Sequence, residues 1–352
     1  MIQEKMSFEN FERFLKSGAI LRWENFFYLM IGPFGQAPQS SEISLFSPDF
    51  FLEHQNKKVS GSQAYKISPL EFRSHLQKII ELHGPKLKFD WRPPRYEEYQ
   101  SAFNQVQSEI KAERFQKAVP VLFEQADAEF GPHSCSQVLL NLMSCSERLF
   151  VYGVWDDQGG MLGASPEILV SVRGGELRSM ALAGTQLKDT KVCRLLEDPK
   201  ELHEHQLVVE DILQVLKSFG SVQSDGPHIL ELPSLWHLKT EMRMALREHT
   251  DLVQLIRKLH PTPAVGVFPR EDGFALMKSL PQSTMRKKFG APFAMFFPNG
   301  DMVSVVAIRN IQWSRNQILL GAGGGVVHSS QIENEWLELE GKRQSVKSLM
   351  GL

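Results

Sequence analysis

Apolar residues in the first ninety positions occur in short runs that turn-forming residues separate. The runs at 26–31 and 43–46 are long enough for strands, and Gly32-Pro33 and Gly61 are typical of turns. One longer segment, 69–82, is expected to be a helix. Residues 1–90 are therefore predicted to be a strand-rich part of the same fold as the remainder of the chain.

The remainder, 91–352, mixes longer helical segments with further strands. Because strands and helices do not alternate regularly, a doubly wound parallel sheet is not favoured, and the pattern predicts an α+β fold with large antiparallel sheets and packed helices. Helices are expected at 96–112, 200–219 and 252–259, strands at 115–119, 303–308 and 317–320, a hairpin joining 167–172 to 177–182 through Gly174 and Gly175, and a mixed segment at 236–247.

Composition narrows the class of protein without identifying it. With 42% hydrophobic and 23% charged residues, the chain of 352 residues has the composition of a soluble globular protein. Its net charge of −2 gives no reason to expect nucleic acid or a membrane surface as a partner. Three cysteines without a paired motif suit a reducing cytoplasm. No run approaches the roughly 18 apolar residues of a membrane span, and no secretory signal is recognisable.

The last segment places charge on an apolar helix face. On a 3.6-residue period, Glu335, Glu338 and Lys342 share a stripe with Leu339 and Val346. Carboxylates on a buried face need a cation or a metal ion, because burying an unpaired one costs several kcal/mol. The alternative is that Glu338 and Lys342 form an ordinary surface pair of about 0.2–0.5 kcal/mol.

A glycine cluster precedes this helix. Gly323, Gly324 and Gly325 follow the strand at 317–320 and remove side chains where it ends, so that backbone N–H groups could approach a ligand oxygen. A plain turn or bulge would also explain glycine there. Upstream, Arg309 offers a planar donor group suited to a carboxylate or phosphate.

Three further residues could carry chemistry. Glu204 shares the apolar face of the helix at 200–219, and if it meets Glu338 in space the two carboxylates form an oxygen site for a hard cation such as Mg²⁺. The adjacent His203 and His205 point away from each other on a helix, so zinc is not favoured. Glu167 lies at the mouth of a strand. Lys117 begins another strand, a place where lysine is usually solvated.

In combination, these motifs resemble the chorismate-binding enzymes, a family that includes the isochorismate, salicylate, anthranilate and aminodeoxychorismate synthases. The resemblance covers roughly residues 96–352 and implies antiparallel sheets packed as a sandwich with surrounding helices, as in anthranilate synthase component I. The motifs occur in family order: the strand of Lys117, then ASPE (164–167), LAGT (182–185), KELHEHQLV (200–208), LWHLKT (235–240), LHPTPAVG (259–266), AIR (307–309), GAGGGVV (321–327) and EWLE (335–338).

The resemblance implies a role for each matching residue. Lys117 would be the general base that activates water and Glu167 the general acid. Mg²⁺ would bind Glu204 and Glu338, with Glu335 as a nearby or water-mediated partner. The residues expected to bind the substrate chorismate are Gly184, Thr185, His237, Phe289, Arg309, Gly323, Gly324, Gly325 and Lys342.

Two motifs discriminate within the family. Members that deliver ammonia typically have glutamine at the position of Lys117, so this chain resembles a water user that needs no glutamine amidotransferase subunit. The HPTPA segment resembles isochorismate synthases, with salicylate synthase as the alternative. The sequence leaves open whether the product would serve menaquinone or siderophore biosynthesis.

Two departures from the family pattern suggest a third reading. Pro120 interrupts the strand of Lys117, and FGAPFA (289–294) replaces a glycine-richer segment. A chorismate-binding protein with weakened catalysis is consistent with both changes.

Overall fold

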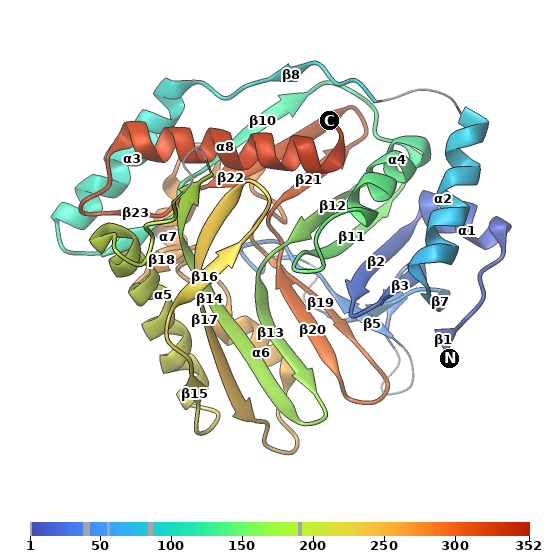
Figure 1. Ribbon diagram of the computed structural model, residues 1–352, viewed down its shortest axis with the longest axis horizontal. Coiled ribbons are helices and arrows are strands. Elements are labelled where there is room, and N and C mark those ends of the chain that lie inside the picture. Colours follow the sequence, from blue (N-terminus) through green and yellow to red (C-terminus); the bar gives the residue numbers. More distant parts are fainter. Residues whose placement is uncertain (1, 38–42, 55–56, 84–86, 189–191) are drawn as a thin grey trace.

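Two ten-stranded β-sheets form the centre of the protein in the computed structural model, which describes residues 2–37, 43–54, 57–83, 87–188 and 192–352 (Figure 1). Neighbouring strands are antiparallel apart from β1 and β7. Apolar side chains from both sheets share one buried cluster, in which Leu21 and Met30 lie with Phe293 and Val303. The sheets therefore face each other, and the predicted α+β class is confirmed.

The first sheet has the order β1-β7-β3-β2-β11-β12-β21-β22-β10-β8. Its strands are β1 (Ile2–Gln3), β2 (Gly18–Trp23), β3 (Phe26–Ile31), β7 (Gln63–Ile67), β8 (Trp91–Arg92), β10 (Val121–Ala126), β11 (Phe150–Asp156), β12 (Gly159–Ser165), β21 (Asn310–Ser314) and β22 (Gln317–Gly323).

The second sheet has the order β15-β17-β14-β13-β20-β19-β5-β6-β4, with β16 also paired to β17. Its strands are β4 (Gly35–Gln36), β5 (Ser44–Phe46), β6 (Val59–Ser60), β13 (Ile168–Arg173), β14 (Glu176–Leu187), β15 (Gln223–Ser224), β16 (His228–Glu231), β17 (Leu235–Ala245), β19 (Pro292–Phe296) and β20 (Met302–Val306). A small third sheet has the order β18-β9-β23, with β9 (Lys117–Ala118), β18 (Val267–Phe268) and β23 (Val326–Val327).

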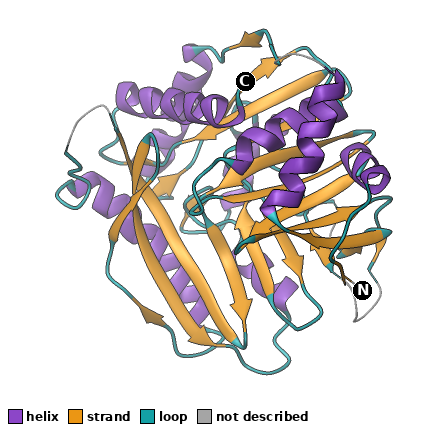
Figure 2. Cartoon of the chain, turned by 45° about the vertical axis from the view of Figure 1, so that its right-hand side comes forward, coloured by secondary structure: helices purple, strands orange, loops and turns teal. Residues whose placement is uncertain are grey.

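Helices cover the outer faces of the sheets (Figure 2). One group packs its apolar side chains on the first sheet: α1 (Phe8–Lys16), α2 (Pro69–His83), α4 (Pro132–Met143) and the end of α8 (Ile332–Met350). The other group packs on the second sheet and the small sheet: α3 (Tyr96–Lys111), α5 (Pro199–Lys217), α6 (Leu252–Leu259) and α7 (Gly273–Ser279), with a short 3-10 turn at Ser283–Met285. None of the helices in these described ranges has an apolar stretch long enough to cross a bilayer.

The structure corrects several expected elements. The first ninety residues contain two helices instead of one, since Phe11 and Phe14 of α1 are buried and Ser7 caps the helix by accepting a hydrogen bond from the amide of Asn10. The mixed segment 236–247 is instead one long strand, β17, which pairs with β14 along its length. β22 continues through the glycines to Gly323 because β10 pairs with it as far as that residue.

A buried polar network fixes the loop between β20 and β21. The Tyr152 hydroxyl donates to the carbonyl of Ile308 at 2.9 Å and accepts from the Asn310 side-chain amide at 2.7 Å, which also donates to the carbonyl of Ala307. Between these residues Arg309 has a φ of 56°, a left-handed backbone conformation that is unfavourable for arginine. The network therefore holds a strained residue in place.

Removing the Tyr152 hydroxyl should destabilise the fold. In Tyr152→Phe, the carbonyl of Ile308 loses its donor and the buried side-chain amide of Asn310 loses an acceptor, which we expect to lower the free energy of unfolding by about 1–3 kcal/mol. Urea unfolding of the variant and the parent measures the difference. Tyr28→Phe is the matched control, because Tyr28 lies in the same apolar layer between the sheets and no hydrogen bond of its hydroxyl is found within the described ranges. Equal losses in the two variants would contradict the role of the network.

Candidate active site

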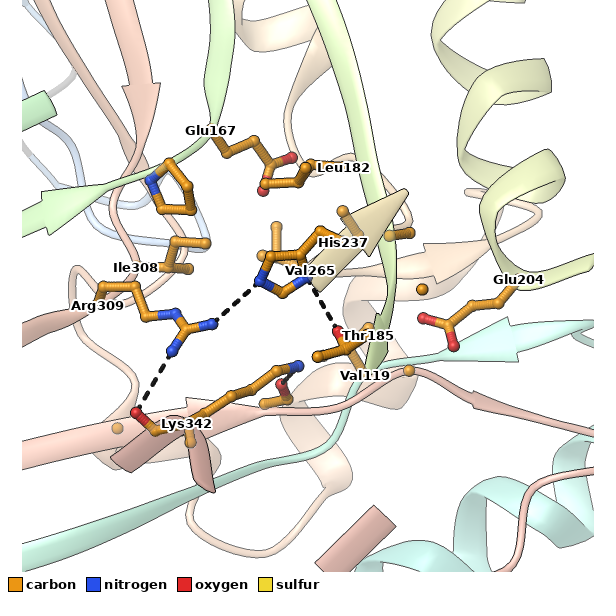
Figure 3. A pocket seen from close by; sticks show the side chains of 18 of the residues that line it. Val119, Glu167, Leu182, Thr185, Glu204, His237, Val265, Ile308, Arg309 and Lys342 are labelled. Atoms are coloured by element: carbon orange, nitrogen blue, oxygen red, sulfur yellow. Dashed lines mark hydrogen bonds between the residues drawn. The ribbon is translucent and has the colours of Figure 1, made fainter. Parts of the chain in front are cut away.

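A cavity opens where β14, β17, β22 and α8 approach one another (Figure 3). Its empty volume is about 670 Å³ when the open solvent at its mouth is included. The residues of the predicted site that line the cavity are Glu167, Gly184, Thr185, Glu204, His237, Phe289, Arg309, Gly323, Gly325 and Lys342.

Glu167 is a buried acid with a free oxygen. It follows β12, and its backbone is held by the Ser165 hydroxyl and by the amide of Val306. The side chain is 2% exposed, and its Oε1 atom finds no hydrogen-bond partner in the described part of the chain. Burial raises the pKa of Glu167 to about 8, although Lys117 and Lys342 act in the opposite direction. The carboxyl group is therefore mainly protonated at neutral pH and can donate a proton.

The opposite side of the cavity carries positive charge. Arg309 places one nitrogen 3.4 Å from Nε2 of His237 and another 3.4 Å from the carbonyl of Lys342 (Figure 3). Burial, Arg309 and Lys342 hold the pKa of His237 well below its usual value, so the ring is neutral. Its Nδ1 atom lies 3.1 Å from the Thr185 hydroxyl. Among the described residues no carboxylate lies within 4.0 Å of Arg309, so its charge is available to a ligand.

The glycines near the cavity make room for side chains. At Gly325, a Cβ atom would lie 2.1 Å from Oε1 of Glu204 and 2.7 Å from Cε of Lys117. At Gly324, it would lie 3.4 Å from Oε2 of Glu335. A larger residue at 325 would therefore displace both charged groups. The sequence predicted free backbone amides here, and the observed close approach of carboxylates is a further reason for glycine.

A cluster of carboxylates from α5 and α8 surrounds one ammonium group. Nζ of Lys200 lies 2.8 Å from Glu201, 2.9 Å from Glu335 and 3.3 Å from Glu204. Burial and neighbouring carboxylates raise the pKa values of Glu201 and Glu335 to about 7. Burial alone would raise the pKa of Glu204, but Lys117 and Lys200 outweigh it and lower the value to about 2.

The structure changes how the two predicted acidic helices meet. The sequence paired Glu204 with Glu338, whereas in the structure Glu204 and Glu335 share Lys200. Glu338 instead accepts from Lys342 at 2.5 Å, so the i,i+4 pair considered as the alternative is present in partly buried form. Glu335, which was expected to be a nearby or water-mediated partner of the metal ion, is more buried than Glu338.

The donor set fits a hard cation such as Mg²⁺. All the available ligand atoms are carboxylate oxygens, and Oε2 of Glu335 is buried without a hydrogen-bond partner in the described part of the chain. Their positions, however, are those of an ammonium site. No three His, Cys, Asp or Glu side chains within the described ranges converge closely enough to hold a metal ion.

Lys117 lies behind the cavity wall instead of on it. The side chain is 1% exposed, and its Nζ atom forms an ion pair of 3.0 Å with Oε1 of Glu204, which does line the cavity. β9 is only two residues long because Pro120 separates it from β10. The predicted base therefore lies directly behind two residues of the cavity wall, Glu204 and Gly325.

Sequence reasoning missed Lys200 and Glu201. Besides accepting from Lys200, Glu201 accepts the backbone amide of Thr185 at 2.8 Å and so joins α5 to the cavity wall. The sequence contains a signal for Glu201, because the spacing Glu-x-x-Glu occurs at 201–204 and again at 335–338. An i,i+3 spacing places both acids of each pair on one helix face.

The unusual FGAPFA segment contributes only Phe289 to the cavity lining given by the described residues. Phe289 lines it and packs edge-on against Phe123 at 5.6 Å between ring centroids. Ala291 and Ala294 are fully buried, and Pro292 begins β19. The added bulk is thus accommodated inside the second sheet.

Comparison with known proteins agrees with this arrangement. Residues 55–351 match the family described as chorismate binding enzyme. Isochorismate synthase MenF of Bacillus subtilis is 30% identical over 291 residues, covering 80% of this chain and 59% of MenF. The salicylate biosynthesis isochorismate synthase of Pseudomonas aeruginosa is 34% identical over 204 residues, covering 54% of this chain and 43% of that enzyme.

A solved structure shows the same fold. DhbC of Bacillus anthracis has a TM-score of 0.81 at 22% identity, covering 98% of this chain and 100% of DhbC. The chain spans about half the length of the curated relatives it matches. Because the family match nevertheless extends over most of its residues, this chain belongs to the chorismate-binding enzyme family.

Proposed function

We propose that the protein is an isochorismate synthase, which converts chorismate to isochorismate. The observation that carries this proposal is the protonated, buried Glu167, which lies on the cavity wall with Lys117 behind the neighbouring Glu204. A reaction that adds water at one ring carbon and expels a hydroxyl group from another needs a base and an acid on separate sides of the ring. The two relatives named above are isochorismate synthases, which supports the same reaction.

The two ends of the cavity suit the two carboxylates of chorismate. Arg309 can form a charge-assisted, bidentate interaction with the enolpyruvyl carboxylate, and His237 helps to orient its guanidinium. The ring carboxylate would face Glu204, which is negatively charged, and Glu335, which is partly ionised at neutral pH. A carboxylate can be bound there only with a cation between it and the acidic cluster.

The residues of the chain can then perform the isomerisation. Lys117 accepts a proton from water as the oxygen forms a bond to C2, the two ring double bonds shift, and the bond from C4 to its hydroxyl breaks. Glu167 donates a proton to the departing hydroxyl, which leaves as water. One water enters and one leaves, so the product is an isomer. Only a neutral amine can accept a proton, so the ion pair between Lys117 and Glu204 has to be broken before this step. Glu204 then needs a partner other than Lys117.

Mg²⁺ is the cofactor that we propose for the acidic cluster. Glu204 and Glu335 would hold it, with Glu201 and Glu338 beside them, and its charge would balance the ring carboxylate and polarise the ring. Water as the nucleophile requires no glutamine amidotransferase partner. The three free cysteines are consistent with the cytoplasm as the place of action.

Product identification is the decisive experiment. With chorismate and Mg²⁺, we expect isochorismate by chromatography, and EDTA should abolish its formation. Lys117→Ala and Glu167→Gln should each reduce kcat by about 10²–10⁴-fold, because each removes a proton-transfer group. Accumulation of salicylate and pyruvate would identify the lyase activity instead. If chorismate binds but neither product forms, the protein is a binder with lost catalysis.

The pKa of Glu167 predicts the alkaline side of the pH profile. The acid form is needed, so kcat/KM should fall as the pH rises through about 8. Steady-state kinetics from about pH 6.5 to about pH 9.5 would measure the fall in kcat/KM, because this range covers both protonation states of Glu167. A profile without a decline above pH 8 would contradict the assignment of Glu167 as the acid.

Unfolding measurements supply a control that needs no substrate. The pKa of Glu167 is higher in the folded protein than in the unfolded chain. The contribution of Glu167 to the free energy of unfolding is therefore complete below the unfolded pKa and is lost as the pH rises to about 8. Relative to Glu167→Gln, the parent should lose about 1.4 kcal/mol for each pH unit within that window.

Arg309 should determine substrate affinity more than rate. Arg309→Met removes the bidentate donor, and we expect KM for chorismate to increase by about tenfold or more, since a charged hydrogen bond contributes about 1.5–3 kcal/mol. Arg315→Met is the matched control, because Arg315 is exposed in the turn between β21 and β22. An unchanged KM in Arg309→Met would show that the carboxylate binds elsewhere.

A further inference from the structure

Lys200 occupies the centre of the acidic cluster although nothing in the motif analysis gave it a role. It lies in the first turn of α5, where the Asp198 cap accepts its backbone amide at 2.9 Å. Its side chain is 21% exposed, whereas that of Glu335 is 2% exposed and that of Glu204 is 8% exposed. The lysine therefore reaches from the edge of the cluster into its buried centre.

The charges of this cluster are not balanced by one ammonium group. Lys200 contacts three carboxylates, and Lys117 contacts Glu204 from the other side. One oxygen of Glu335 still has no hydrogen-bond partner within the described ranges. The cluster has the capacity for a cation of higher charge.

A divalent ion and the Lys200 ammonium group would need the same oxygens. Mg²⁺ requires oxygen ligands at about 2.0–2.1 Å in a nearly octahedral arrangement, and an ammonium group among those oxygens leaves no space for it. Lys200 has a flexible side chain that begins near the solvent, so its amine can leave without rearrangement of the helix. Glu201, Glu204 and Glu335 would then be free to turn toward a metal ion.

We propose that Lys200 is an internal counter-ion which holds the carboxylates of α5 and α8 together and must be displaced before a divalent metal ion can bind. The inference rests on the proposed function, because the metal ion belongs to it. Lys200 is thus a positioning residue that keeps the carboxylates of Glu201, Glu204 and Glu335 in one place and sets the affinity for the metal.

Metal titration without chorismate tests the proposal. Isothermal titration calorimetry with Mg²⁺, repeated with Mn²⁺, would compare the whole protein with Lys200→Met. We expect the variant to bind the ion at least about tenfold more tightly, because no ion pair has to be broken first. Lys217→Met, at the exposed C-terminal end of the same helix, should bind like the parent. Equal or weaker binding by Lys200→Met would overturn the proposal.

A second variant and a measurement on the parent guard against misfolding. Lys200→Gln retains hydrogen bonding but not the charge, and it should also bind the ion more tightly. In the parent, saturating Mg²⁺ should increase acetylation of the Lys200 amine, measured by mass spectrometry, relative to Lys217. If Mg²⁺ leaves Lys200 as protected as before, the ammonium group is not displaced.

The two proposals can fail separately. Tighter metal binding by Lys200→Met in a protein that forms no isochorismate would support the counter-ion and reject the proposed function. Mg²⁺-dependent isochorismate formation with unchanged metal affinity in Lys200→Met would support the proposed function and reject the counter-ion. Absence of metal binding in both the parent and Lys200→Met would overturn the counter-ion proposal.

Discussion

The confinement of like charges in one small volume is the constraint on which the site depends. Glu201, Glu204 and Glu335 are buried together, and their mutual repulsion has to be offset by cations within hydrogen-bonding distance. Lys200 and Lys117 supply this charge from opposite sides of Glu204. The glycine at 325 follows from the same constraint, because a side chain there would separate Glu204 from Lys117.

Much of the fold could be predicted from local patterns. The helix at 252–259 and the hairpin through Gly174 and Gly175 agree with α6 and with β13 and β14, because periodicity and turn residues are local signals. The strand β17 was misread although a local signal is present, because Lys239, Glu241 and Arg243 alternate with the buried Thr240, Met242 and Met244. Such period-2 alternation is typical of a strand, so this segment could have been predicted.

The site was predictable in its composition but not in its pairing. The motifs indicated which side chains are polar and buried, and most of them do line one cavity. Which acid meets which cation depends on the rotation of α5 relative to α8, and a sequence contains no direct measure of that angle. For this reason the prediction placed Glu338 on the metal ion with Glu335 as a nearby or water-mediated partner, whereas Lys200 joins Glu335 to Glu204 in the structure.

The position of α8 over β22 has a consequence for the order of assembly. Glu335 joins the acidic cluster, and Lys342 reaches the cavity, only when this helix has docked, more than a hundred residues along the chain after Glu204. A folding intermediate without α8 would have a cavity that lacks one wall and an acidic cluster that lacks Glu335. Substrate and metal ion would then recognise only the completely folded protein, and each would shift the folding equilibrium toward it.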